Sequence, residues 1–241
     1  MKYLEYFNYL VKWLQDEVKK AKMKGVIVGL SGGIDSSLVA AIAKKAFPNN
    51  SLGIIMPINS MANDLDDIKA LVNNIKIETL EVNLKDSYNE LLKNLNINDK
   101  LAIANIKPRL RMTTLYAIAQ AKKYLVLGTD NFSEMYLGYF TKYGDGGVDL
   151  LPIVHLKKSE VKQMSKEIKV IPESIINKKP SAGLWENQSD EEELGFSYDQ
   201  FELFFTNPEK LSNEIIKKIK KQHKITQHKR KAIPKPKKMY E

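Results

Sequence analysis

Near its start the chain carries the stretch Val26-Ile27-Val28-Gly29-Leu30-Ser31-Gly32-Gly33-Ile34-Asp35-Ser36-Ser37, an apolar run that breaks into small residues. The run is typical of a buried β-strand, the glycines of a tight turn, and the residues after Gly33 of a helix. Glycine adopts positive φ without strain and lets backbone N–H groups close on an anion. The start of the helix adds unpaired N–H groups and a positive dipole end. The stretch therefore predicts a phosphate-binding turn, although neither GxxxxGKS/T nor GxGxxG is present.

Asp35 is unexpected in such a turn, because a carboxylate repels a phosphate. The contradiction disappears if a cation such as Mg²⁺ bridges the carboxylate to phosphate oxygens. The alternative is that Asp35 and Ser36 only cap the helix, as such residues often do. This stretch alone leaves both interpretations open.

Apolar runs alternate with amphipathic segments on both sides of this stretch. We expect further strands over 52–56, 77–82 and 124–127, and helices over 3–20, 35–47, 64–73, 84–95 and 108–121. This alternation predicts an α/β fold with an open, Rossmann-like parallel sheet and helices on both faces. In such sheets ligands bind at the carboxyl ends of the strands.

The last third of the chain is less regular. We expect a short strand over 150–154, a helix over 158–168, a polar, mobile loop over 178–195 and a helix over 209–221, followed by a basic tail. Because no internal repeat or linker interrupts the pattern, residues 1–241 are predicted to form one domain.

The composition excludes several classes of protein. The 241 residues contain no cysteine, which removes disulfides, thiolate metal sites and cysteine nucleophiles. No apolar run reaches the length of a membrane span and the N-terminus lacks a signal-peptide pattern, so we expect a cytoplasmic protein.

The formal net charge of +9 is compatible with nucleic-acid binding. However, only Arg109, Arg111 and Arg230 among the 38 basic residues are arginines, and the lysines are spread along the predicted helices. A lysine-rich, solvated surface is therefore the simpler interpretation, and no nucleic-acid partner is expected. The rare arginines are more informative, because arginine makes planar, bidentate contacts with carboxylates and phosphates.

Two further loops repeat the pattern of small and polar residues. The first, Gly128 to Glu134, follows a predicted strand, so Glu134 and Asp35 are expected at the same edge of a parallel sheet, where two carboxylates and a phosphate suit Mg²⁺. The alternative for Glu134 is a favourable place near a helix dipole. The second, Lys142 to Asp149, contains three glycines in four positions, and a plain turn is its alternative.

Together these segments resemble the NAD synthetases, members of the ATP pyrophosphatase group with an adenine nucleotide alpha hydrolase-like fold. The matching segments, in the family's order, are 31–36, 109–112, 128–130, 138–147, 156–158, 180–184, 190–195 and 228–230. The first segment is shared by all ATP pyrophosphatases, whereas 138–147 is specific to NAD synthetases.

The resemblance implies a role for each matching residue. The residues that it places at ATP are Gly29, Leu30, Ser31, Gly32, Gly33, Ile34, Asp35, Ser36, Thr129, Lys158 and Ser181. Those that it places at deamido-NAD are Arg109, Lys142, Asp149, His228 and Lys229. It also implies that Asp35 and Glu134 bind Mg²⁺, and that Asp35 and Lys158 are catalytic. Arg111 receives no role beyond helix surface or structure.

In that family the nicotinate carboxylate of deamido-NAD attacks the α-phosphate of ATP, and pyrophosphate leaves. Ammonia then converts the adenylate to the amide of NAD, with release of AMP. The resemblance therefore implies a ligase that forms a C–N bond. Since the chain lacks cysteine and has little sequence before Val26 for a glutaminase domain, we expect it to use free ammonia. A separate glutaminase partner stays open.

The family also forms homodimers that share the deamido-NAD site. Helix 3–20 and the helix after Pro108 are the candidate interfaces, and loop 178–195 and a companion around 83–90 are expected to close over ATP. Three alternatives stay open: another amidating ATP pyrophosphatase similar to GMP synthetase, a tRNA-thiolating relative, and a basic nucleic-acid-binding protein. The second normally needs catalytic cysteines, and the third leaves Asp35 and Glu134 unexplained.

Overall fold

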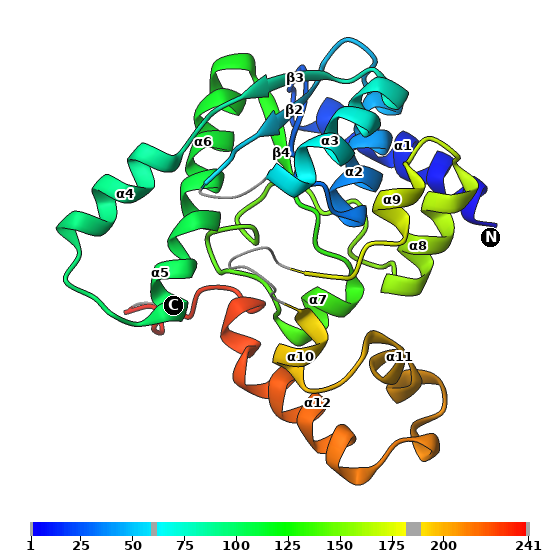
Figure 1. Cartoon of the computed structure of the whole chain (residues 1–241), viewed down its shortest axis with the longest axis vertical. Helices are drawn as coiled ribbons and strands as arrows, with labels where there is room; N and C mark the ends of the chain where they lie inside the picture. The colour runs from blue at the N-terminus through cyan, green and yellow to red at the C-terminus, as the bar shows by residue number, and fades with distance from the viewer. Residues whose placement is uncertain (1, 59–61, 182–188, 240–241) are drawn as a thin grey trace.

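The computed structural model describes residues 2–58, 62–181 and 189–239, and within them the strands form one parallel sheet in the order β3-β2-β1-β4 (Figure 1). The strands are β1 (Gly25–Gly29), β2 (Ser51–Ile55), β3 (Glu78–Glu81) and β4 (Tyr124–Leu127). The chain moves outward from β1 to β3 and then returns to the other side of β1 for β4. The carboxyl ends of β1 and β4 therefore flank the switch point at which ligands bind in such sheets. The predicted open parallel sheet is confirmed.

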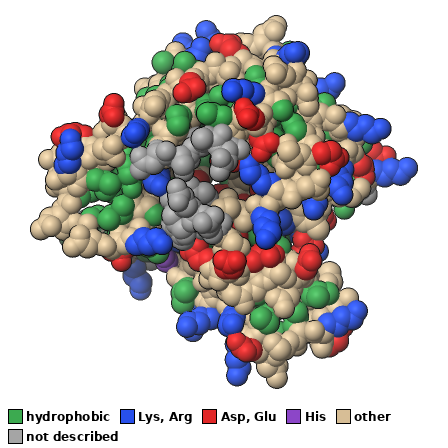
Figure 2. All heavy atoms as spheres, in the orientation of Figure 1, with side chains coloured by type: hydrophobic (Ala, Val, Ile, Leu, Met, Phe, Trp, Pro, Cys, Tyr) green, Lys and Arg blue, Asp and Glu red, His purple; other side chains and the backbone are tan. Residues whose placement is uncertain are grey.

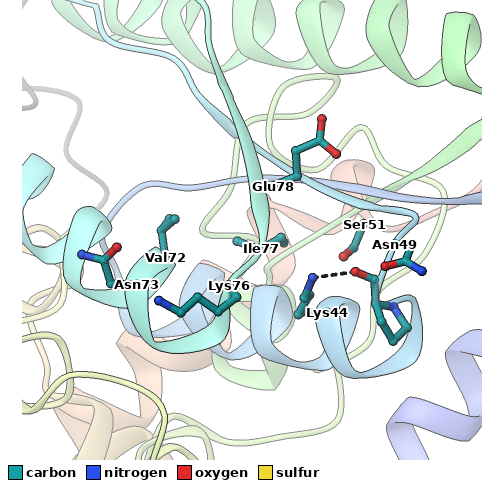
Figure 3. A pocket seen from close by; sticks show the side chains of 9 residues that line it. Lys44, Asn49, Ser51, Val72, Asn73, Lys76, Ile77 and Glu78 are labelled. Atoms are coloured by element: carbon teal, nitrogen blue, oxygen red, sulfur yellow. Dashed lines mark hydrogen bonds between the residues drawn. The ribbon is translucent and has the colours of Figure 1, made fainter.

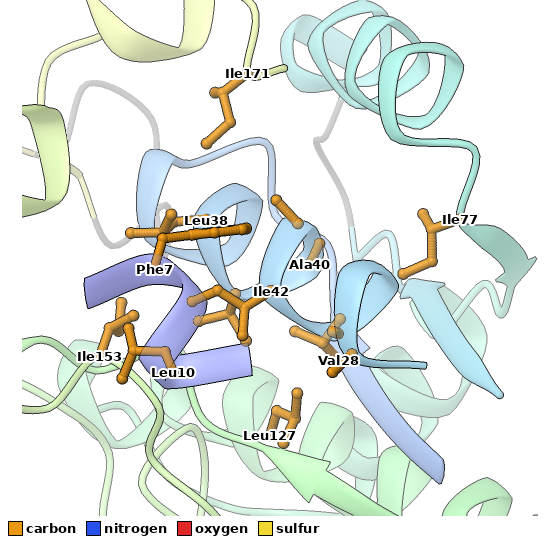
Figure 4. Packing of buried hydrophobic residues seen from close by; sticks show 14 of the residues in the cluster. Phe7, Leu10, Val28, Leu38, Ala40, Ile42, Ile77, Leu127, Ile153 and Ile171 are labelled. Atoms are coloured by element: carbon orange, nitrogen blue, oxygen red, sulfur yellow. The ribbon is translucent and has the colours of Figure 1, made fainter. Parts of the chain in front are cut away.

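One face of the sheet is covered by helices that share a hydrophobic cluster with Val26 and Val28 of β1. These helices are α1 (Tyr3–Lys20), α2 (Ile34–Ala46), α3 (Ala62–Ile75), α8 (Lys158–Glu167) and α9 (Glu173–Ile176). The apolar residues of α1 recur every three or four positions, so the helix buries one stripe, which includes Phe7 and Leu10. Helix α2 lies beneath it with Leu38, Ala40 and Ile42 in the same cluster (Figure 4). Because α2 is enclosed by other elements, its start is held firmly at the end of β1.

The opposite face is covered by α4 (Lys85–Asn94), α5 (Lys100–Ala104) and α6 (Ile106–Lys122), so the prediction of helices on both faces is also confirmed. Leu115 and Ala119 of α6 pack with Ile27 of β1. Helix α6 begins two residues before Pro108, which lies in its first turn, where the missing N–H has no intrahelical partner to lose. The segment around 83–90, expected to be a companion loop, is helical from Lys85 onward.

Helix α7 joins the C-terminal elements in a smaller hydrophobic cluster around Leu137, Phe201 and Ile219. The bounds are Phe132–Leu137 for α7, and the C-terminal elements are α10 (Asp190–Leu194), α11 (Tyr198–Thr206), η1 (Pro208–Lys210), α12 (Asn213–Ile225) and η2 (Gln227–Lys229). In Figure 1, α10, α11 and α12 lie together below the body that contains the sheet. No helix in the described ranges is long and apolar enough to cross a membrane.

Three local predictions in the last third of the chain need correction. The segment 150–154 is not a strand: only Leu150 bridges to Leu127, because the chain turns at Pro152, which has no N–H to donate. The expected loop 178–195 contains helix α10, while residues 182–188 lie outside the described residues. The helix expected over 209–221 begins at Asn213, where Ser212 supplies the N-cap.

Candidate active site

The turn between β1 and α2 is held in shape by its own hydroxyl groups. The Ser31 Oγ accepts a hydrogen bond from the Gly33 N–H at 3.2 Å, and the Ser36 Oγ donates one to the Gly33 carbonyl at 3.0 Å. Gly33 is the N-cap of α2 and has no side chain with which to cap it. Among the described residues no side chain caps the first N–H groups of α2, which is the arrangement of an anion site.

Gly32 meets two separate constraints in this turn. Its φ is +77°, in the region that side chains disfavour. A Cβ at this position would also lie 2.9 Å from the Cβ of Asp64, at the start of α3. The close approach of α3 and the shape of the turn both require glycine here.

The turn between β4 and α7 is built differently, because it caps its own helix. Asn131 is the N-cap of α7, and its Oδ1 accepts from the Glu134 N–H at 3.0 Å. The Glu134 Oε2 accepts from the Asn131 N–H at 3.2 Å, which completes a capping box. This reciprocal pair fixes the side chain of Glu134 at the sheet edge.

Asp35, Glu134 and Lys158 meet at the switch point of the sheet. The Nζ of Lys158 lies 2.5 Å from the Asp35 Oδ2 and 3.0 Å from the Glu134 Oε1. The Asn131 Nδ2 donates to the other Asp35 oxygen at 2.9 Å. The charged side chains are only 13 to 15% exposed. The structure thus brings together the two predicted metal ligands and the predicted catalytic lysine.

Burial governs the electrostatics of this cluster. It raises the pKa of Glu134 to about 7, and the charge of Lys158 offsets part of that rise. Burial opposes the charge of Lys158, but Asp35 and Glu134 outweigh it and raise the pKa of the lysine. The ring of Tyr198 lies 5.4 Å from the same Nζ and closes that side of the cluster. Lys158 is therefore a fixed positive charge in the ligand-free chain.

A second pair of acids lies nearby: Asp130 is buried and Asp145 is exposed, and the sequence analysis assigned neither of them a role. Desolvation raises the pKa of both carboxyls, and for Asp130 the charge of Asp145 adds to the effect. The Oδ2 of Asp130 is buried with no hydrogen-bond partner among the described residues. The Oδ1 of Asp145 accepts from the Thr141 N–H at 3.0 Å. Their positions in segments 128–130 and 138–147 were the available signal, since both segments match the family.

Arg111 lies beside this pair and is structural, one of the two interpretations open at the sequence level. It is half-buried, and its Nε donates to the Met56 carbonyl at 3.2 Å. It therefore ties α6 to the end of β2.

Three of the residues predicted to contact deamido-NAD lie side by side. The Arg109 Nη2 donates to the Lys142 carbonyl at 3.4 Å, and the Lys142 Nζ donates to the His228 carbonyl at 2.9 Å. The imidazole of His228 is exposed on η2. The tail and α6 thus meet at residues 138–149, the glycine-rich loop, although they are far apart in sequence.

The other two predicted deamido-NAD residues make contacts within the chain. Asp149 accepts from the Tyr116 hydroxyl at 2.9 Å and from the Val126 N–H at 2.8 Å. The Nζ of Lys229 donates to the carbonyls of Gly138 and Phe140, at 2.7 and 2.6 Å. In the ligand-free chain these two residues fasten the glycine-rich loop and the tail.

The remaining predicted ATP residues surround the switch point. Thr129 is half-buried after β4, and Ile34 is half-buried at the start of α2. Leu30 is buried, and its N–H donates to the Ile54 carbonyl at 2.8 Å, so only its backbone borders the turn. Ser181 is exposed at the end of a described range, and the rest of its motif, residues 182–184, lies outside the described residues.

Helix α10 borders the site from the C-terminal part of the chain. In the space-filling view acidic side chains gather over this helix (Figure 2). The Tyr139 hydroxyl donates to the Glu193 Oε2 at 2.7 Å, and the Tyr198 hydroxyl donates to the buried Asp190 Oδ2 at 3.2 Å. These bonds connect α10 to the glycine-rich loop and to the ring beside Lys158.

A separate cavity of about 460 Å³ lies at the opposite edge of the sheet, where β2 and β3 begin (Figure 3). Ser51 and Glu78 line it, together with Lys44 and Lys76. The Lys44 Nζ donates to the Pro48 carbonyl at 2.5 Å. This cavity lies at the amino ends of β2 and β3, whereas the candidate site lies at the carboxyl ends of the strands, where parallel sheets bind their ligands.

The fold and the site together define a nucleotide-binding α/β protein, with an open anion turn and a carboxylate pair at the switch point of a Rossmann-like sheet. A family model described as NAD synthase matches residues 6–234. An NH(3)-dependent NAD(+) synthetase from Mycoplasmopsis pulmonis is 59% identical over 233 residues, which cover 96% of this chain and 90% of that protein. The chain belongs to the NAD synthase family.

Two solved structures are similar over nearly the full chain. An NMN synthetase from Francisella tularensis has a TM-score of 0.92 at 37% identity, and the match covers 98% of this chain and 99% of that one. An NH3-dependent NAD synthetase from Campylobacter jejuni has a TM-score of 0.84 at 29% identity, with 98% and 100% covered. Membership makes the chain an ATP-using C–N ligase, and it favours NAD synthesis over a GMP synthetase-like or nucleic-acid-binding function.

Proposed function

We propose that this chain is an ammonia-dependent NAD synthetase whose reaction centre is the cluster of Asp35, Glu134 and Lys158. The observation that carries this assignment is the convergence of the cluster with the uncapped start of α2 at the switch point. The substrates are ATP, deamido-NAD and ammonia, and the products are NAD, AMP and pyrophosphate. The reaction needs mainly positioning and charge stabilisation from the protein, which is what the site offers.

The residues of the chain divide this work. The free N–H groups at the start of α2 bind the phosphates that leave as pyrophosphate, and Ser31 and Ser36 keep the turn in shape. The ammonium of Lys158 stabilises negative charge on the phosphates during attack by the nicotinate carboxylate. Thr129 and Ser181 contact ATP. Burial of the cluster excludes water, which protects the adenylate from hydrolysis.

The residues of the cluster fit Mg²⁺. The carboxylates of Asp35 and Glu134 direct one oxygen each at a single cation, the Lys158 ammonium, so the pair already forms a cation site. No group of three or more metal-ligating acids, histidines or cysteines is found among the described residues, and Mg²⁺ characteristically uses one or two carboxylates with substrate phosphates and water. When bound, Mg²⁺ would neutralise charge on the triphosphate.

Arg109, Lys142 and His228 form the deamido-NAD site in this proposal, since they gather at the loop specific to the family. Replacing Lys142 by alanine should raise the KM for deamido-NAD more than the KM for ATP. Lys231→Ala, an exposed lysine of the tail, is the matched control. Equal losses for both substrates would remove Lys142 from the deamido-NAD site.

We further propose that the chain acts as a homodimer. Helix α1 leaves Leu4 and Tyr9 about half exposed, and the segment from α4 to α5 exposes Leu95, Ile97 and Leu101. Exposed apolar side chains that are grouped on one surface favour burial of that surface against a second copy of the chain. Light scattering during gel filtration would measure the mass, and a monomer at assay concentrations would contradict the dimer.

The proposal also includes one domain over residues 1–241, a cytoplasmic location and the direct use of ammonia.

The test of the proposed function is NAD formation by the purified chain with ATP, Mg²⁺ and deamido-NAD, with either ammonium or glutamine. We expect product with ammonium alone, with AMP and pyrophosphate in equal amounts. Since one similar structure is named an NMN synthetase, nicotinate mononucleotide is tested in parallel. Faster turnover of the mononucleotide would replace deamido-NAD as the assigned substrate and would leave the assignment of the ATP site unchanged.

A further inference from the structure

All four carboxylate oxygens of Asp35 and Glu134 are occupied by donors of the chain itself. Asn131 donates to one oxygen of each residue, through its side-chain Nδ2 to Asp35 and its backbone N–H to Glu134. Lys158 donates to the remaining oxygen of each residue. Each oxygen keeps a second lone pair, but the Lys158 Nζ occupies the point at which the Asp35 Oδ2 and the Glu134 Oε1 converge, so a metal ion held by both of these oxygens has to take the place of the ammonium.

The two sets of donors differ in how readily they leave. Asn131 is fully buried and caps α7, so its displacement would break the capping box and the start of a helix. Lys158 contributes only the end of a long, flexible side chain from the first residue of α8. The lysine is therefore the donor that a metal ion displaces.

The displaced ammonium needs a new negative charge, because burial opposes a lone charge at this depth. The uncapped start of α2 lies next to Asp35 in the chain and is the anion site of the cluster. An incoming triphosphate supplies the missing charge there. A metal ion that arrives without nucleotide supplies none.

We propose that Lys158 is a resident cation that occupies the metal site of the free enzyme and yields it only when ATP arrives. The metal and ATP then bind cooperatively, and the released lysine contacts the phosphates. This inference rests on the proposed function, which supplies ATP and the divalent cation. By thermodynamic linkage, each ligand strengthens the other by the same factor, typically about 5- to 150-fold in coupled sites.

The direct test measures Mn²⁺ binding to the nucleotide-free protein by electron paramagnetic resonance, with Mn²⁺ in place of Mg²⁺. Lys158→Met removes the charge and keeps most of the side-chain length. It should bind Mn²⁺ at least about tenfold more tightly than the wild type, at the low end of such couplings. Lys162→Met changes an exposed lysine of the same helix and should bind like the wild type. The double variant Lys158→Met, Glu134→Gln should lose the gained affinity, because one ligand is missing.

A second measurement uses the wild type alone, so it holds even if Lys158→Met does not fold. Mn²⁺ added to the nucleotide-free protein should leave the midpoint of thermal unfolding unchanged. The same concentrations of Mn²⁺ should raise the midpoint of the protein that already holds a non-hydrolysable ATP analogue. Tight Mn²⁺ binding by the nucleotide-free wild type would overturn the inference. So would a folded Lys158→Met protein that binds Mn²⁺ no better than wild type. Because neither readout is NAD formation, an inactive protein with the expected Mn²⁺ behaviour would refute the proposed substrate and leave this inference standing.

Discussion

The turns after β1 and β4 have the same topology and opposite chemistry. Both follow neighbouring parallel strands and both open a helix at the same edge of the sheet. The first has glycine at the N-cap, so the N–H groups of α2 stay available. The second has Asn131 at the N-cap and Glu134 at the third helical position, so the end of α7 satisfies itself. One residue at the N-cap thus decides whether a turn binds an anion or presents a carboxylate.

The two turns are also joined through Asn131. Its Nδ2 holds Asp35 of the first turn while its Oδ1 caps the helix of the second. Because Asn131 is fully buried, these bonds are shielded from water and position both acids. The site is therefore one unit assembled from two local structures.

The largest expected effect comes from removing the acid of the first turn. Asp35→Asn should lower kcat by about 100-fold or more, because an electrostatic contribution to the reaction centre is lost. The fold should persist, since an amide oxygen can still accept from Asn131. Steady-state NAD formation with far-ultraviolet circular dichroism checks both parts. Unchanged turnover would remove Asp35 from the reaction centre.

The shape of the first turn can be broken at Gly32. Gly32→Ala should lower the free energy of unfolding by about 1–3 kcal/mol, because a side chain is strained at positive φ. The new Cβ also meets the Cβ of Asp64. Gly33→Ala is the matched control, since its nearest neighbour is the Ser31 hydroxyl at 3.3 Å and its φ is negative. Urea unfolding of both variants gives the comparison, and equal losses would contradict the role of positive φ.

The two duties of Asn131 can be separated. Asn131→Ala should lower the free energy of unfolding by about 1–2 kcal/mol through loss of the cap. Asn131→Ser keeps a cap acceptor but loses the side-chain amide that reaches Asp35, so it should be more stable than the alanine variant and still lose turnover. Thermal unfolding and kcat measured on both variants test this. If serine restored both properties, the bond to Asp35 would have no function.

The smallest expected effect is a change in pH dependence. The pKa of Glu134 is raised from 4.5 to about 7, so the folded chain holds this proton more tightly than the unfolded chain. The associated stability is present below pH 4.5 and is lost as the pH rises through about 7, by less than about 1.4 kcal/mol for each pH unit. Glu134→Gln should flatten this decline in metal-free buffer. Urea midpoints from pH 5 to 8 measure it, and identical slopes would contradict the raised pKa.

Much of the sheet was predictable because its signals are local. The apolar run before Gly29 and its alternation with helical segments predicted four parallel strands, which the structure confirms. Predictions failed where tertiary contacts override the local pattern. The segment 150–154, predicted as a strand, turns at Pro152, and helix α11, which was not predicted, packs Phe201 in one cluster with Leu137 and Ile219. The sequence of α11 contains no turn signal or motif that would have indicated this cluster.

The site divides along the same line. Local sequence predicts the small residues of the turn after β1 and the positions of Asp35 and Glu134, because turn geometry and strand order depend on neighbours in the chain. The bonds from Lys158 to both acids and from Asn131 to Asp35 join residues 24 to 123 positions apart. Such contacts arise only when separate helix starts pack at one switch point. The residue types and the sheet edge are thus determined by the amino-acid sequence, whereas only the packing of α2, α7 and α8 decides which cation the two carboxylates hold.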